Sequence, residues 1–152
     1  MLNDANKNVV LIAKGSKAGE AALFKALEIA NELKCNKLFM LFVADNDFFA
    51  GDGSGFSKSE ESVNEGLDAI GDAILRKLIN IAKEMDEKIK VETIVLHGNT
   101  ASEILDFVKN NKIDVLVIPR DKRGPIEKSL TGGDIEPFIK EISNYTKLIL
   151  VE

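Results

Sequence analysis

Apolar residues gather in five short runs along the chain, and longer stretches of mixed apolar and polar residues separate these runs. Several runs are apolar at every position, which is typical of parallel strands that are covered on both faces. The pattern therefore predicts five strands, at residues 9–13, 38–43, 91–96, 115–118 and 148–151.

The stretches between the runs carry apolar residues at helical spacing. These stripes lie at residues 23–33, 67–85, 104–108 and 135–142. Thr100 followed by Glu103 predicts a capping box at the start of the third helix, and Ser57 with Glu60 offers the same signal for the second. The order β-α-β-α-β-α-β-α-β predicts an α/β fold: one doubly wound domain over residues 1–152, with a five-stranded parallel sheet and helices on both faces.

The amino-acid composition and net charge limit the classes of function that this protein can have. The sequence has 152 residues, of which 45% are hydrophobic and 30% charged, as in an ordinary globular domain. Its net charge of −5 argues against nucleic-acid binding, which needs a surplus of Lys and Arg. No apolar run approaches the length of a membrane span, and the first residues lack a signal-peptide pattern. The single cysteine, Cys35, cannot form an internal disulfide, so we expect a cytoplasmic protein with neither membrane nor nucleic-acid partners.

Four stretches resemble the universal stress protein family. Residues 95–105, Val-Leu-His-Gly-Asn-Thr-Ala-Ser-Glu-Ile-Leu, are similar to the family's turn after the third strand, a glycine followed by a helix. Residues 113–118 match its Asp-Leu-Ile-Val strand, and residues 14–16, Lys-Gly-Ser, resemble the Asp-Gly-Ser that ends its first strand. Residues 148–151 resemble its last strand, so the resemblance covers nearly the whole chain in the right order.

The resemblance implies the family's sheet order, 3-2-1-4-5, in a fold like that of the adenine nucleotide alpha hydrolases. In such a sheet the ligand crevice lies beyond the carboxyl ends of the strands where the order reverses, here strands 1 and 4. The resemblance therefore implies a nucleotide or anion site for ATP or AMP. Its candidate residues are Lys14, Gly15, Ser16, Val43, Pro119, Lys122, Gly132 and Gly133.

The family's nucleotide-binding motif is altered in this sequence. Nucleotide-binding members carry Gly, two residues, Gly, nine residues and then Gly with Ser or Thr, and these glycines let backbone N–H groups approach the phosphates. The corresponding residues here are Pro119, Lys122, Gly132 and Gly133. Pro119 has no N–H to donate, and Lys14 stands where those members have an Asp that contacts the adenosine end. These changes disfavour the usual ATP geometry.

Three functions remain open from the sequence. The altered pocket favours a non-enzymatic stress-response protein that does not bind ATP in the usual family way. The alternative is an ATP- or AMP-binding regulatory switch, in which cationic side chains form a remodelled phosphate site. The same cations are also consistent with solvated loop residues that bind nothing. They are Lys14, Arg120, Lys122, Arg123 and Lys128. A small hydrolase on the same scaffold is the third function, although the sequence has no recognisable nucleophile with a partner base.

Four other residues were candidates for chemistry. His97, the only histidine, follows the third strand, and a structural or surface role is expected because no nucleophile or second histidine accompanies it. Cys35 is expected to be buried as a small hydrophobic residue. Asp45 and Asp47 follow the second strand on the ligand side, but two acids in a loop are weak grounds for a metal site. We predict no catalytic and no metal-ligating residue.

The last strand also predicts assembly. Residues 148–151 form an uncharged apolar edge, which acts as a pairing template unless it is covered. We predict a homodimer through this edge, paired antiparallel with Lys147 opposite Glu152 of the second copy.

A Gly- and Ser-rich segment lies between the second strand and the second helix. Residues 50–62 are expected to form a surface loop. A lid over the crevice is the alternative, since Phe48, Phe49 and Phe56 offer apolar surface.

Overall fold

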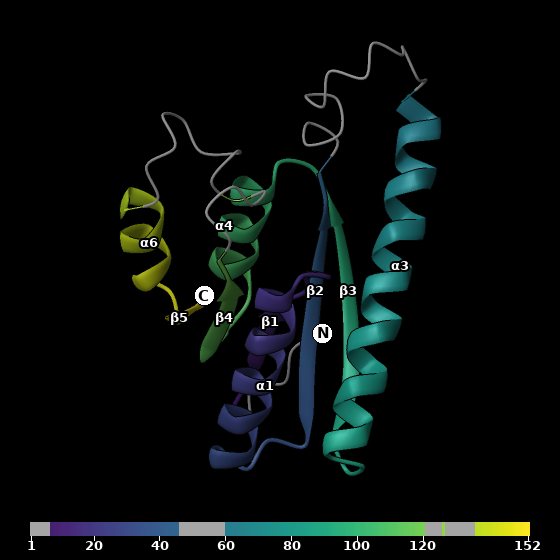
Figure 1. Ribbon diagram of the computed structural model, residues 1–152. Helices are drawn as coiled ribbons and strands as arrows, with labels where there is room; N and C mark the ends of the chain where they lie inside the picture. The colour runs from purple at the N-terminus through teal and green to yellow at the C-terminus, as the bar shows by residue number, and fades with distance from the viewer. Residues whose placement is uncertain (1–6, 46–59, 121–125, 127–135) are drawn as a thin grey trace.

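A five-stranded parallel sheet forms the centre of the computed structural model, which describes residues 7–45, 60–120, 126 and 136–152 (Figure 1). The strands lie in the order β3-β2-β1-β4-β5, and every neighbouring pair is parallel. The expected sheet order is therefore confirmed. The strands are β1 (Val9–Ile12), β2 (Lys37–Ala44), β3 (Lys90–His97), β4 (Val115–Pro119) and β5 (Lys147–Val151).

Two helical layers cover the sheet. α1 and α3 pack on one face, and α4 and α6 pack on the other (Figure 1). This arrangement confirms the predicted doubly wound α/β fold. The helices are α1 (Lys17–Glu32), α3 (Glu60–Met85), α4 (Thr100–Asn110) and α6 (Glu136–Ser143).

The central strand β1 is buried on both faces. Val9 and Leu11 belong to the core beneath α1 and α3, while Val10 and Ile12 belong to the core beneath α4 and α6. None of the four side chains is more than 6% exposed. The alternation follows from the two-residue repeat of a strand, and it explains why the run is apolar at every position.

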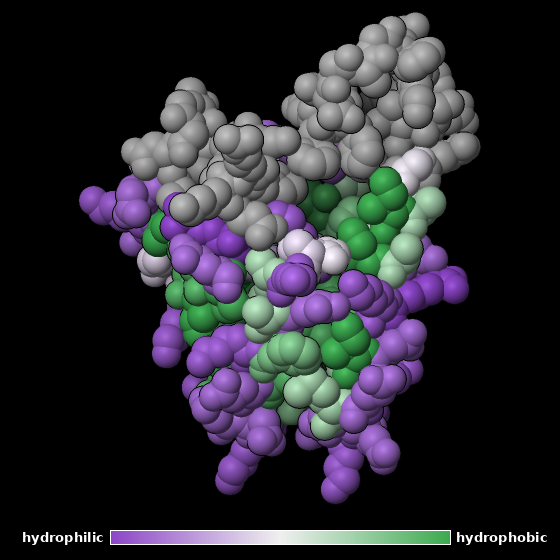
Figure 2. Space-filling model, viewed as in Figure 1, coloured by the Kyte–Doolittle hydropathy of each residue, from purple (hydrophilic) through white to green (hydrophobic). Residues whose placement is uncertain are grey.

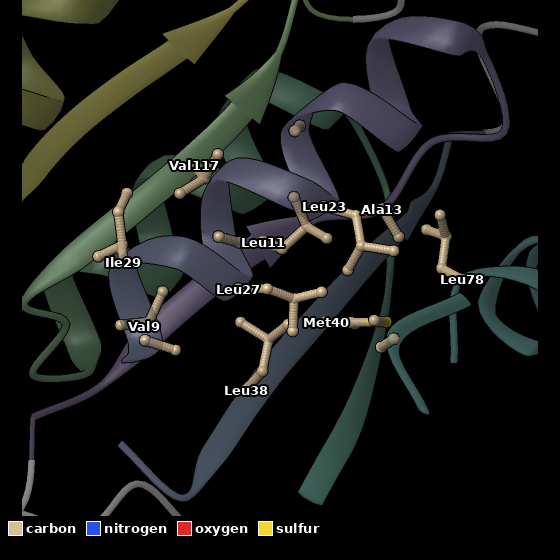
Figure 3. Close-up of a cluster of buried hydrophobic side chains, with 14 of the residues drawn as sticks. Val9, Leu11, Ala13, Leu23, Leu27, Ile29, Leu38, Met40, Leu78 and Val117 are labelled. Atoms are coloured by element: carbon tan, nitrogen blue, oxygen red, sulfur yellow. The ribbon is translucent and has the colours of Figure 1, made fainter. Parts of the chain in front are cut away.

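The packing of α1 onto the sheet is visible in Figure 3. Leu23 and Leu27 extend from the helix toward Leu11 and Met40 on the strands. Leu23, Leu11 and Met40 are fully buried. Burying one such side chain stabilises the fold by about 1.5–3 kcal/mol, so this contact is a large part of what holds α1 in place.

The end of α1 is closed by a Schellman motif. Lys34 has a φ of 57°, and its N–H donates to the Asn31 carbonyl, while the Cys35 N–H donates to the Ala30 carbonyl over 2.7 Å. This pair of bonds satisfies carbonyls that the helix leaves without partners. Cys35 is thereby placed against the core, where it is only partly buried, although the sequence predicted a buried residue.

α3 is much longer than the strands it covers. Its 26 residues span about 39 Å, whereas the eight residues of β2 span about 27 Å, so the helix continues past the carboxyl ends of β2 and β3 (Figure 1). Gly71 is buried where α3 crosses β2, and a Cβ added there would lie 2.4 Å from Cε1 of Phe42. The close approach of helix and strand therefore depends on this glycine.

An ion pair joins α3 to α1. Lys77 Nζ lies 3.1 Å from Glu20 Oε1 in the first turn of α1. Hydrophobic residues gather between the two helices, and charged side chains surround them (Figure 2). Because both charged groups are substantially exposed, the pair orients the helices more than it stabilises them.

β5 forms one edge of the sheet, and its two faces constrain any pairing through that edge. Ile149 and Val151 pack against the core under α1, and Leu148 and Leu150 pack against the opposite core. Residues directly opposite in an antiparallel pair share a face of the sheet. The predicted register is therefore wrong, because Lys147 and Glu152 of one chain lie on opposite faces; a two-fold register must centre on a residue.

In the part of the chain that the structure describes, no helix is both long enough and apolar enough to cross a lipid bilayer.

Replacing Gly71 by alanine tests the contact between α3 and β2. The added methyl group meets a buried aromatic ring, so we expect Gly71→Ala to lower the free energy of unfolding by about 1–3 kcal/mol in urea denaturation. Gly66→Ala is the matched control, because no atom lies within 4 Å of a Cβ at that position. Alanine propensity alone raises stability there by up to about 1 kcal/mol. Equal effects of the two substitutions would contradict the packing argument.

Candidate functional site

The candidate crevice lies at the carboxyl edge of the sheet, where the order of strands reverses between β1 and β4. The chain leaves β1 through Lys14, Gly15 and Ser16. Ser16 is the N-cap of α1, and its hydroxyl accepts a hydrogen bond from the Gly19 N–H over 3.2 Å. One of the predicted site residues thus has a structural role as a helix cap.

The turn after β1 is tightly packed. A Cβ on Gly19 would lie 1.9 Å from the Lys14 carbonyl oxygen, so only glycine fits where α1 passes over this turn. A Cβ on Gly15 would lie 3.2 Å from Cγ1 of Ile74, a residue of α3. This helix therefore also lies close to the turn. The backbone of this part of the crevice is therefore held by both helices.

The exit from β4 is fixed by the edge strand. Pro119 is buried and lies opposite Val151, and the Arg120 N–H donates to the Val151 carbonyl over 2.8 Å. Nη1 of Arg120 lies 3.9 Å from Oε1 of the exposed Glu152. Pro119 is thus a residue of the β4–β5 ladder.

Two cationic residues follow the adjacent strands β1 and β4: Arg120 comes directly after β4, and Lys14 lies two residues beyond the end of β1. Because β1 and β4 are parallel neighbours in the sheet, both residues lie at its carboxyl edge. Both side chains are partly exposed. Two positive charges at the point of strand reversal favour an anionic ligand.

The structure places five of the predicted site residues. Lys14, Gly15, Ser16 and Pro119 lie around the strand reversal, whereas Val43 near the end of β2 packs against the core under α4. Other predicted features lie outside the described residues: Lys122, Gly132, Gly133, the remaining loop cations Arg123 and Lys128, Asp47, Ser57, and the phenylalanines of the lid hypothesis.

Asp45 has a role that the sequence did not reveal. It is 6% exposed, and its carboxylate accepts hydrogen bonds from the Thr100 N–H (2.9 Å) and the Thr100 hydroxyl (2.6 Å). A carboxylate is well placed at the N-terminus of α4, where N–H groups lack partners within the helix. Among the described residues, no cluster of three or more His, Cys, Asp or Glu side chains suits a metal ion.

The start of α4 differs from the predicted capping box. Asn99 is the N-cap, and its side-chain oxygen accepts from the Ser102 N–H over 3.0 Å. Thr100 is already the first residue of the helix, and its hydroxyl donates to the Asp45 carboxylate. Gly98, with a φ of 143°, makes the turn into this cap possible.

His97 lies at the surface end of β3. Its Nε2 atom is 2.8 Å from Oδ1 of Asp68 on α3, and both side chains are about half exposed. This contact joins the amino-terminal half of α3 to the end of β3. This contact is the surface role expected for His97.

The Cys35 thiol lies at the opposite, amino-terminal edge of the sheet. Its Sγ–H donates to the Lys7 carbonyl over 3.4 Å. Burial raises the pKa of this thiol, the Asp114 carboxylate raises it further, and Lys7 lowers it. The thiolate is therefore disfavoured, unlike that of a catalytic cysteine.

These features define a doubly wound α/β protein of the Rossmann-like class, whose strand order reverses between β1 and β4. The sequence profile of the universal stress protein family matches residues 5–140. The chain belongs to this family, as its sequence resemblance implied.

A sequence relative and three solved structures extend the comparison. Universal stress protein MJ0531 of Methanocaldococcus jannaschii is 29% identical over 134 residues, which cover 88% of this chain and 76% of the relative. A universal stress protein of Archaeoglobus fulgidus in complex with dAMP aligns with a TM-score of 0.59 and 16% identity, covering 97% of this chain and 98% of its own. An Arabidopsis thaliana family member with AMP bound aligns with a TM-score of 0.60 and 18% identity, covering 95% and 92%.

A universal stress protein in complex with cAMP aligns with a TM-score of 0.61 and 18% identity, covering 97% of this chain and 98% of its own. At these identities the structural likeness is one of fold. All three of these relatives carry an adenine nucleotide, which bears on the function proposed below.

The buried carboxylate of Asp45 is tested by truncation. Asp45→Ala leaves two buried donors of Thr100 without their acceptor, so we expect the free energy of unfolding to fall by about 2–4 kcal/mol. Asp68→Ala is the matched control, since it removes an exposed partner of His97 and costs less than about 1 kcal/mol. Urea denaturation measures both variants, and a loss for Asp45→Ala no larger than for Asp68→Ala would count against the assigned role.

The raised pKa of Cys35 predicts a pH-dependent reactivity. Iodoacetamide should alkylate the folded protein with a pH midpoint above that of the urea-unfolded chain, because the folded state disfavours the thiolate. A raised thiol pKa contributes stability that is present below the unfolded-state pKa and is lost as the pH rises through the folded-state value. The only cysteine is Cys35, so the label reports one site. Coincident midpoints would show that the fold does not perturb this thiol.

Proposed function

We propose that this protein is a non-enzymatic stress-response regulator that binds an adenine nucleotide at the carboxyl edge of β1 and β4. Nucleotides bound to three relatives of the same fold support this ligand class. The observation that carries the proposal is that two cations, Lys14 and Arg120, follow the two strands on either side of the sheet reversal.

In this proposal the nucleotide phosphates are bound in a different way from that of the family's glycine motif. Pro119 has no N–H and cannot reach a positive φ, so it cannot provide the close backbone approach that glycine gives. Side-chain cations take over the phosphate contacts instead. A phosphate group carries about −1.5 to −2 charges at neutral pH, and charge-assisted hydrogen bonds to Lys or Arg suit it.

A binding role is favoured over catalysis because the reactive side chains near the crevice already have structural partners. The Ser16 hydroxyl caps α1, and the Asp45 carboxylate holds the start of α4. His97 contacts Asp68. A nucleophile with an aligned base, which a hydrolase needs, is not formed by these residues in the part of the chain described.

A ligand-independent scaffold is the second candidate function. The buried position of Pro119 in the β4–β5 ladder favours it, because this residue closes the place where a phosphate-binding turn begins in nucleotide-binding relatives. In this case the protein acts through its surface and its dimer interface, without a bound nucleotide.

Calorimetry with AMP, and with ATP and Mg²⁺, distinguishes the two candidates. We expect wild-type protein to bind with micromolar affinity, and we expect Lys14→Ala and Arg120→Ala each to weaken binding by about 10- to 100-fold, the value of one charge-assisted hydrogen bond. Lys83→Ala, at the far end of α3, is the control and should leave the affinity unchanged. Binding unaffected by the two crevice substitutions would refute the cationic site. No binding by the wild-type protein would favour the scaffold.

We also propose that the protein forms a homodimer through β5. The strand is an edge of the sheet, and residues 148–151 are apolar and only half-buried. A two-fold antiparallel register centred on Ile149 or on Leu150 places residues of the same face opposite one another. Such pairing covers an edge that is otherwise open to aggregation.

A charge in the middle of this edge tests the dimer. Leu150→Lys should halve the solution mass measured by light scattering, because it places two like charges close together at the interface. Val95→Lys on the other edge strand, where Val95 is 43% exposed, is the matched control and should leave the mass unchanged. Circular dichroism checks that both variants keep their helices. An unchanged mass for folded Leu150→Lys would exclude this interface.

A further inference from the structure

We draw no further inference here: the strongest candidate, the apolar face between α1 and α3 on which Phe24 and Ile70 are exposed, carries none because nothing in the structure shows what covers it.

Discussion

The arrangement of helices and strands in this molecule depends on the burial of β1 on both of its faces. Four consecutive apolar side chains, those of Val9–Ile12, point alternately into two separate cores. Neither core closes without a helical layer, so α1 and α3 are needed on one face and α4 and α6 on the other. Parallel strands joined by right-handed crossovers then bring every strand-to-helix turn to one edge. The position of the candidate crevice is thus a consequence of how the core is buried.

Among the described residues at that edge, several polar side chains serve the fold. Ser16 and Asn99 cap their helices, and Asp45 reaches from β2 to the start of α4. Helix ends beside a buried core have to be satisfied in this way, because unpaired N–H groups are costly there. The described residues that follow β1 and β4 at this edge include the cations Lys14 and Arg120, and Nη1 of Arg120 lies 3.9 Å from Oε1 of Glu152.

The order of elements and the parallel sheet could be predicted because they depend on runs and stripes that a sequence displays directly. Two features could not be predicted. The N-cap of α4 is Asn99 and not Thr100, whose hydroxyl instead contacts Asp45, 55 residues away in the chain. The burial of Asp45 depends on the same distant contact. Both of these features depend on a contact between segments that lie far apart in the sequence. The register proposed for β5 is a different case: it followed charge and ignored the alternation of faces along a strand, which the order of residues already implies.

The glycine at position 19 has a consequence for how relatives of this protein diverge. With α1 resting on the Lys14 carbonyl, a side chain at position 19 leaves no room for the present turn between β1 and α1. A lineage that replaced this glycine would have to lengthen the turn or lift the helix, and either change would move the floor of the crevice. Substitutions at position 14 face no such barrier, because they alter only the side chain. Substitutions at position 14 can therefore alter the charge at this edge while the backbone beneath it keeps its shape.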